Sequence, residues 1–407
     1  MHEGDILSGP GKHKPLTILA AGDICPGDKA VMGLGVRSKT QRHGSDFPFE
    51  HVKSHLAHGD IVLANLEGYL SSEASSGGQR ARTFCGREDF AEAMVRAGFN
   101  VVSVANNHVL EHGEAAFVES VRILKRAGLR VCGLRSRLDK YYSEPVFFDA
   151  QGIRTALVGY NWISVDRLGN ADEHIAQSLD SAVNYSWHRE HPVTAIERAN
   201  ANVIRDLRTL KKEADVVALV AHWGYEFVTV PPYGVTREAR TFVDAGADLI
   251  IGIHPHVIQG AESYKNGLIL YSLGNFVFDM RRRLTRYSMI AEIHVDEAKK
   301  TDVKFTPFFI NRSFQPSPAS EKDAAKVRAI IANSELRLAS PVKEQVLCDD
   351  VLYRLHEDRY NRGKALAILD HLAGAARRPA VVLTILRKLW AAAGVLVNRL
   401  RGRRVRW

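Results

Sequence analysis

The chain has 407 residues, of which 45% are hydrophobic and 25% charged, a composition typical of a globular protein with a large core. Its formal net charge of +9 arises in the tail, because residues 377–407 contain nine Lys and Arg and no Asp or Glu. The rest of the chain is close to neutral, which argues against a nucleic-acid partner. The four cysteines form no CxxC pair, so we expect neither a disulfide framework nor a zinc ribbon.

Residues 1–15 are polar and rich in glycine and proline, and we expect a flexible N-terminus. They lack the apolar stretch of a secretory signal, and no run of 18 or more uncharged apolar residues follows. These features predict a cytoplasmic protein without a standard membrane-spanning helix.

Strand and helix patterns alternate from residue 16 onward. Apolar runs predict strands at 16–23, 60–67, 100–108, 129–134, 215–224 and 248–254, and helical periodicity marks 87–98, 114–128, 196–212 and 236–247. Residues 145–160 predict a hairpin, and a β-rich end comprises 267–278, 288–295 and 303–310. This order implies an α/β domain, with the later hairpins as a second or edge sheet. We expect the domain to span 16–318, a helical extension 319–376, and a basic tail 377–407.

Residues of metal-ligand type follow five of the predicted strands. They are Asp23, Glu67 after Asn65, the run Asn106-Asn107-His108, His222, and the pair His254 and His256. In an open α/β sheet the carboxyl ends of the strands line one crevice, where ligands bind. Five such clusters in succession favour convergence on one site over five unrelated turns.

The residue types suit divalent cations. Imidazole binds Zn, Mn or Fe, and a carboxylate can bridge two cations. Two cations about 3.5–4 Å apart can activate a water and hold both oxygens of a phosphoryl displacement. We expect His254 and His256, which flank Pro255, to point the same way in an extended segment, one toward each cation.

Six motifs carry a family resemblance. They are GD (22–23), ANLEG (64–68), ANNHVLEHG (105–113), AHWGYEF (221–227), GADLIIGIHPHVIQGAE (246–262) and YSLGNFVFD (271–279). In this order, over roughly residues 16–310, they resemble the bacterial capsule-biosynthesis CapA family, or poly-γ-glutamate biosynthesis proteins. That family is itself similar to calcineurin-like metallophosphoesterases.

The resemblance implies a four-layer α/β/β/α metallophosphoesterase-like sandwich with a helical C-terminal extension. It also implies roles for particular residues. Asp23 and His256 would bind the first metal, Glu67 would bridge, and Asn107, His222 and His254 would complete the second, while His108 would be the catalytic acid. Two divalent cations (Mn, Zn or Fe) are implied, and Glu226 and Asn275 would shape the substrate pocket.

The first motif departs from the phosphoesterase pattern. There, a histidine follows two residues after the aspartate, whereas Cys25 stands at that position here. Cys25 is either a thiolate ligand or, the interpretation we favour, a buried apolar residue. In the second case one metal site has fewer ligands, and a single bound cation is an alternative.

Residues 379–407 predict a basic amphipathic helix with a terminal arginine cluster. A charged pair near its centre, Arg387 and Lys388, argues against a membrane span. The helix would lie on an anionic membrane surface, here the inner membrane; docking on a partner protein and a disordered tail are the alternatives.

The sequence therefore predicts a metal-dependent phosphoesterase-like hydrolase in capsule or exopolymer biosynthesis. Its substrate would be an anionic polymer or a phosphorylated small molecule or lipid. The alternative is a non-hydrolytic assembly factor that binds such a polymer or carrier at the metal site. The sequence does not indicate the oligomeric state.

Overall fold

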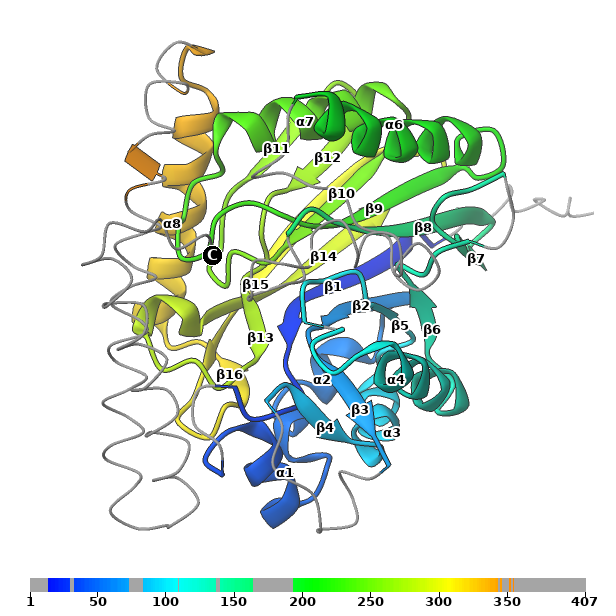
Figure 1. Ribbon diagram of the computed structural model, residues 1–407. Coiled ribbons are helices and arrows are strands. Elements are labelled where there is room, and N and C mark those ends of the chain that lie inside the picture. The colour runs from blue at the N-terminus through cyan, green and yellow to red at the C-terminus, as the bar shows by residue number, and fades with distance from the viewer. Residues whose placement is uncertain are drawn as a thin grey trace, which may run out of the picture.

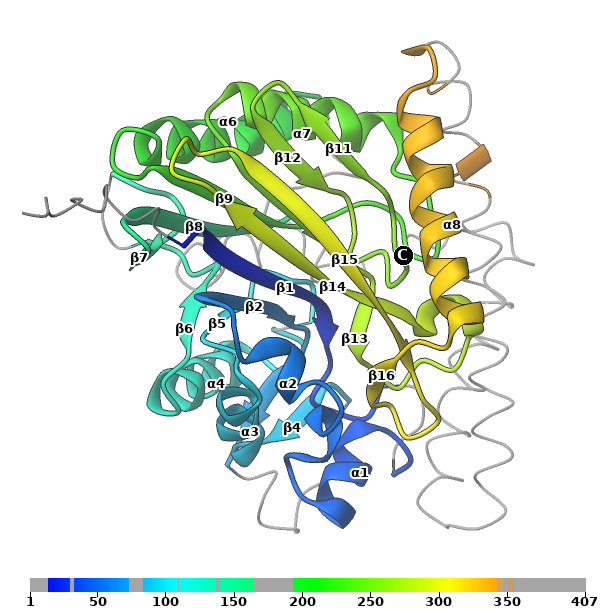
Figure 2. The ribbon, with the colours of Figure 1, turned by 180° about the vertical axis from the view of Figure 1, so that it is seen from behind.

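The computed structural model describes residues 14–29, 33–72, 83–108, 110–136, 140–163, 193–342, 345, 351–352 and 354. Two β-sheets lie face to face, and helices cover both outer faces (Figure 1). The view from behind shows the same layers, with α6 and α7 on one side and α2, α3 and α4 on the other (Figure 2). The predicted four-layer α/β/β/α fold is confirmed.

The first sheet has eight strands in the order β16-β15-β14-β1-β2-β5-β6, with β13 beside the end of β1. They are β1 (Leu16–Ile24), β2 (Ile61–Leu66), β5 (Val101–Ser103), β6 (Arg130–Cys132), β13 (Asn275–Val277), β14 (Tyr287–Val295), β15 (Thr301–Ile310) and β16 (Pro316–Pro318). β1, β2, β5 and β6 run parallel, so their carboxyl ends meet at one edge.

The second sheet has six strands in the order β11-β12-β10-β9-β8-β7. They are β7 (Val146–Ala150), β8 (Ile153–Asn161), β9 (Val216–His222), β10 (Leu249–Ile253), β11 (Ala261–Tyr264) and β12 (Gly267–Leu270). β8, β9, β10 and β12 run parallel, and the predicted hairpin is β7–β8. β3 (Tyr69–Ser71) and β4 (Cys85–Arg87) form a separate pair.

The helices segregate by sheet. α1 (Val36–His43), α2 (Lys53–Leu56), α3 (Asp89–Ala97) and α4 (Glu114–Arg126) lie on the side of the first sheet, with the short η1 (Phe47–Phe49) among them. α6 (Val193–Leu210) and α7 (Tyr233–Asp244) cover the second sheet. η3 (Arg283–Arg286) precedes β14, and α8 (Glu321–Leu338) adds Val327, Ile330 and Ile331 to the core between the sheets.

Alternating side chains divide the apolar residues of each central strand between two cores. In β9, Ala218 and Val220 face the first sheet, and Val217 and Leu219 face the helices α6 and α7. A strand buried on both faces needs apolar residues throughout, which is why these segments read as continuous apolar runs.

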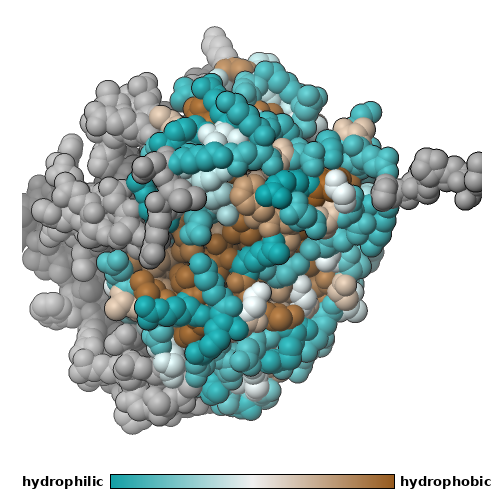
Figure 3. Space-filling model, turned by 90° about the vertical axis from the view of Figure 1, so that its right-hand side faces the viewer, coloured by the Kyte–Doolittle hydropathy of each residue, from teal (hydrophilic) through white to brown (hydrophobic). Residues whose placement is uncertain are grey.

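The edge strands β6 and β7 lie on the face shown in Figure 3, where hydrophobic residues gather near the centre.

The structure differs from the predicted β-rich end in one respect. Residues 267–278 form two strands, β12 and β13, that belong to different sheets. The chain crosses between the sheets at Gly274, whose φ of 69° lies in the left-handed region that favours glycine. Strands β14 to β16 then form one edge of the first sheet, as the edge-sheet alternative predicted.

Among the described residues, no helix is long and apolar enough to cross a membrane. α8 lies in the predicted helical extension, but most of that extension after residue 342 lies outside the described residues. The predicted amphipathic helix at 379–407 and residues 1–13 also lie outside them. The domain boundaries therefore stay predictions.

Candidate metal centre

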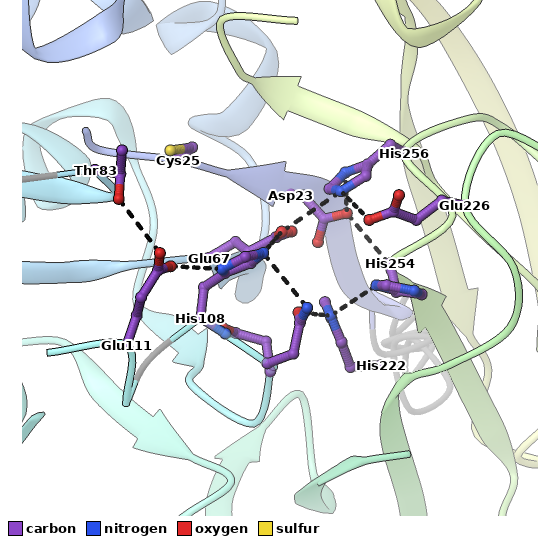
Figure 4. A network of polar contacts seen from close by, with 12 residues as sticks. Asp23, Cys25, Glu67, Thr83, His108, Glu111, His222, Glu226, His254 and His256 are labelled. Carbon is purple, nitrogen blue, oxygen red and sulfur yellow. Dashed lines mark hydrogen bonds and ion pairs between the residues drawn. The ribbon is translucent and has the colours of Figure 1, made fainter. Parts of the chain in front are cut away.

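The structure brings together all six residues predicted to bind metal. Figure 4 labels Asp23, Glu67, His222, His254 and His256. The first sheet contributes Asp23, Glu67 and Asn107, and the second sheet contributes His222, His254 and His256. Their convergence follows from the fold, because the parallel strands of both sheets end on the same side. Ligand atoms of Asp23, Glu67 and His222 all lie within 4.8 Å of one another.

Asp23 is held by two hydrogen bonds at the end of β1. Asn65 Nδ2 donates to its Oδ1 at 2.8 Å, and the backbone N of His254 donates to its Oδ2 at 3.2 Å. The preceding Gly22 allows a close approach, since a Cβ there would lie 1.9 Å from the carbonyl oxygen of Gly274. The GD motif therefore lets β1 and the β12–β13 crossing meet at the site.

Glu67 is fully buried directly after β2. Within the described part of the chain, neither of its carboxylate oxygens has a hydrogen-bond partner. The nearest imidazole nitrogens, His256 Nε2 at 3.5 Å and His108 Nε2 at 3.7 Å, are beyond hydrogen-bond distance. Burial of a carboxylate without hydrogen-bond partners costs several kcal/mol, and a cation held by Glu67 would offset that cost.

A side-chain network fixes the loop after β5. Asn106 Nδ2 donates to Asn65 Oδ1 at 3.1 Å and to the carbonyl oxygen of Leu66 at 2.8 Å. Its Oδ1 accepts from the backbone N of His108 at 3.1 Å. Asn106 and Asn65 thus orient Asp23 and the backbone at His108, a role that the sequence analysis did not assign.

Asn107, His222 and His254 form a compact donor group. His222 Nε2 lies 3.0 Å from Asn107 Oδ1 and 3.1 Å from His254 Nδ1. Two donors that bind one cation at about 2.1 Å each are at most about 4.2 Å apart, and both of these separations are below that limit.

The loop of the two histidines is not the extended segment that the sequence predicted, although both side chains point into the centre. His254 and His256 have φ values of 95° and 58°. Positive φ is unfavourable for residues other than glycine and is tolerated where the surrounding structure enforces it, commonly at functional sites. The ring centroids of His254 and His256 lie 5.9 Å apart.

His256 has a defined tautomer. Asn275 Nδ2 donates to the carbonyl oxygen of Thr285 at 3.1 Å, which leaves Asn275 Oδ1 to accept from His256 Nδ1 at 2.9 Å. His256 Nε2 then carries a lone pair, as a metal ligand must, and it is buried without a partner among the residues described. Asn275 therefore positions His256; its predicted contact with substrate stays a prediction.

The buried charges change the protonation of the site. Burial raises the pKa of Asp23 to about 7. Burial and then the charge of Asp23 raise the pKa of Glu67 well above its usual value. Burial lowers the pKa of His222 and of His256, so both imidazoles are neutral at pH 7. A bound cation would offset the cost of ionising the buried carboxylates. A neutral imidazole has the free lone pair that a cation needs.

His108 lies at the edge of the centre and is held on two sides. Its ring stacks on Phe84 with centroids 3.7 Å apart, and its Nδ1 lies 2.8 Å from Glu111 Oε2. Thr83 Oγ1 donates to the other Glu111 oxygen at 3.3 Å. Glu111 was not singled out from the sequence, although the i, i+3 spacing to His108 was a signal for it.

Cys25 lies in an apolar cluster with Phe84 and Phe278, and its thiol donates to the carbonyl oxygen of Gly27 at 3.8 Å. Burial raises its pKa well above the usual value, which opposes a thiolate. These contacts support the buried, apolar interpretation. The ammonium of Lys29, unnoticed in the sequence, lies over the same two rings, 5.7 Å and 5.2 Å from their centroids.

The fold and the site define a four-layer α/β/β/α protein whose strand ends form a buried cluster of carboxylates and imidazoles suited to a divalent cation. Residues 17–280 match the family model described as bacterial capsule synthesis protein PGA_cap, and the chain belongs to this family.

Two relatives illustrate the family. The capsule biosynthesis protein CapA of Bacillus anthracis is 29% identical over 317 residues, covering 76% of this chain and 72% of that protein. The PGA biosynthesis protein CapA of Bacillus subtilis (strain 168) is 26% identical over 303 residues, covering 74% of each. A solved structure of a putative 5'-nucleotidase from Staphylococcus aureus in complex with alpha-ketoglutarate matches with a TM-score of 0.42 and 15% identity, over 77% of this chain and 58% of that one.

Proposed function

We propose that the protein is a metal-dependent phosphoesterase-like hydrolase that acts in the biosynthesis of a capsule or another anionic exopolymer. Membership of the capsule synthesis family supports the biological role. The observation that carries the chemistry is Glu67, fully buried with two orphaned oxygens between His256 and His108.

The residues of the chain divide the work. A divalent cation bound here would supply a Lewis acid that polarises a phosphoryl oxygen and activates water. Asp23, Glu67 and His256 on one side, and Asn107, His222 and His254 on the other, would hold it or a pair of such ions. His108, which contacts Glu111, would donate a proton to the leaving group.

The surroundings of the site fit an anionic substrate. The half-buried ammonium of Lys29 faces the centre closely enough to lower the pKa of Asp23 and Glu67, although burial outweighs it. Phe84 and Phe278, over which it lies, exclude water from the same side. A phosphate group at the centre would meet a positive charge there.

The test is the activity of the metal-loaded full chain on general phosphomonoester and phosphodiester substrates, with Mn²⁺ or Zn²⁺. We expect His108→Ala to lower turnover by about 10²- to 10⁴-fold without changing the metal content. His58→Ala, at a histidine whose side chain is 48% exposed, is the control. No metal-dependent turnover by the wild type would remove the hydrolase proposal.

One observation favours the non-hydrolytic alternative, an assembly factor that binds an anionic polymer or a phosphorylated carrier. Cys25 leaves the first motif without its second donor, so the centre has fewer ligands than the phosphoesterase pattern provides. Binding of polyglutamate that persists in His108→Ala, together with absent turnover, would support this alternative.

The location remains a proposal as well: a cytoplasmic protein peripheral to the inner membrane through residues 379–407. Flotation of the full chain with vesicles tests it. Binding to anionic vesicles that salt reverses, and no binding to zwitterionic ones, is expected; equal behaviour with both would count against it.

A further inference from the structure

The Asp23 side of the candidate metal centre has three donor residues from the predicted set: Asp23, Glu67 and His256. Divalent cations in proteins generally take four or more ligands. The first motif provides no fourth, because Cys25 lies among Phe84 and Phe278. The Lys29 ammonium over the same rings offers no lone pair, so this direction is closed to a further ligand.

The turn after β9 brings another carboxylate to the centre. Gly224 and Phe227 have φ values of 84° and 66°, which reverse the chain. Phe227 N donates to the carbonyl oxygen of Pro255 at 2.8 Å and so joins this turn to the loop of the two histidines. As a result, Glu226 points toward His256, with a side chain only 14% exposed (Figure 4).

The distances suit a shared cation. Glu226 Oε1 lies 3.9 Å from His256 Nε2, and Glu67 Oε1 lies 3.5 Å from the same nitrogen. Both separations are below the limit of about 4.2 Å for donors of one cation. The nitrogen between them and both Glu67 oxygens are buried and have no hydrogen-bond partner in the described segments.

We infer that Glu226 is a metal ligand on the Asp23 side and supplies the donor that Cys25 does not. This inference rests on the proposed metal-dependent function and gives Glu226 a role other than the predicted substrate contact. Three carboxylates and one imidazole form an oxygen-rich site that favours a hard cation such as Mn²⁺. The group of Asn107, His222 and His254 is richer in nitrogen and suits Zn or Fe.

The experiment titrates chelator-stripped full-length protein with Mn²⁺ by calorimetry and measures bound metal by elemental analysis. Two bound ions are expected for the wild type. Glu226→Gln should weaken one site by at least about tenfold and leave the other unchanged. Glu226→Asp keeps the carboxylate, and its Mn²⁺ affinity at that site should lie between those of the wild type and Glu226→Gln. Glu92→Gln, which removes a carboxylate whose side chain is 66% exposed, should behave as wild type.

The outcomes separate this inference from the proposed function. Identical stoichiometry and affinities for Glu226→Gln and the wild type would overturn the inference and leave the function standing. A wild type that binds no divalent cation would overturn both. A thiolate charge-transfer band in the Co²⁺-loaded protein that Cys25→Ser abolishes would make Cys25 the fourth ligand and also overturn the inference.

Discussion

The two sheets supply the centre with different chemistry and hold it in different ways. The first sheet contributes Asp23, Glu67 and Asn107, ordered by hydrogen bonds among the side chains of Asn65 and Asn106. The second sheet contributes three imidazoles, two of them on a loop with positive φ. One half is thus positioned by a polar network and the other by its backbone, so the halves should respond differently to substitution.

The largest effect should follow from Glu67→Gln, because Glu67 lies where the donors of both sheets meet. The variant keeps the size of the side chain but removes the charge that a cation needs. We expect complete loss of the Mn²⁺-induced rise in Tm, which for the wild type corresponds to about 2.7 kcal/mol at 100 times Kd. Thermal unfolding with and without Mn²⁺ measures it, and a shift of wild-type size would contradict the role of Glu67.

The pH dependence of cation binding should distinguish the carboxylates from the imidazoles. Burial raises the Asp23 pKa to about 7. Protonated Asp23 therefore contributes to the free energy of unfolding of the metal-free protein at low pH, and this contribution is lost as the pH rises from the usual pKa of 3.8 through about 7. A cation must displace that proton and also the proton of Glu67, whose pKa is raised well above its usual value, so the apparent affinity should fall by up to about a hundredfold per pH unit where both carboxyl groups are protonated.

The imidazoles of His222 and His256 should add little to this dependence near pH 7, because burial lowers their pKa values well below the usual value. The Mn²⁺-induced rise in Tm, measured between pH 5.5 and 8, reports this loss of affinity. A rise in Tm that stays constant or grows toward low pH would contradict the prediction.

A smaller effect is expected at Glu111, which contacts His108 and none of the predicted ligands. Glu111→Gln keeps a side-chain oxygen near His108 Nδ1 but removes the charge and weakens the orientation of the ring. Turnover should fall by up to about a hundredfold, with the metal content unchanged. Loss of bound metal in this variant would show that Glu111 supports the centre itself.

The sequence predicted the strand ends well and the loops poorly. Asp23, Glu67 and His222 lie at or next to the ends of buried strands, so apolar runs and parallel pairing suffice to bring them together. Contacts of Asn65, Asn106 and Lys29 depend on how loops from separate strands meet. No local pattern encodes such contacts.

The turn at His254–His256 shows the same limit. An apolar strand followed by a proline segment favours an extended chain, and tertiary contacts override that preference. The backbone N of His254 donates to Asp23 Oδ2, and Asn275 holds the ring of His256. Residue types alone do not report either contact.

The smallest predicted effect concerns the backbone of this turn. With φ at 58°, His256→Gly should be more stable than His256→Ala by about 1 kcal/mol, although both lose the ligand. Chemical denaturation of the metal-free variants measures the difference. At His58, which lies outside the left-handed region, the Gly variant should be less stable than the Ala variant. If the Gly variant were the less stable one at both positions, backbone strain at His256 would be refuted.

The hydrogen bond from His254 to Asp23 spans 231 positions of the chain. A polypeptide emerging from the ribosome therefore carries the early carboxylates long before the histidines that complete the donor set. A cation bound here would therefore be captured late in biogenesis, after the second sheet has packed on the first, and it would link the two sheets rather than nucleate folding.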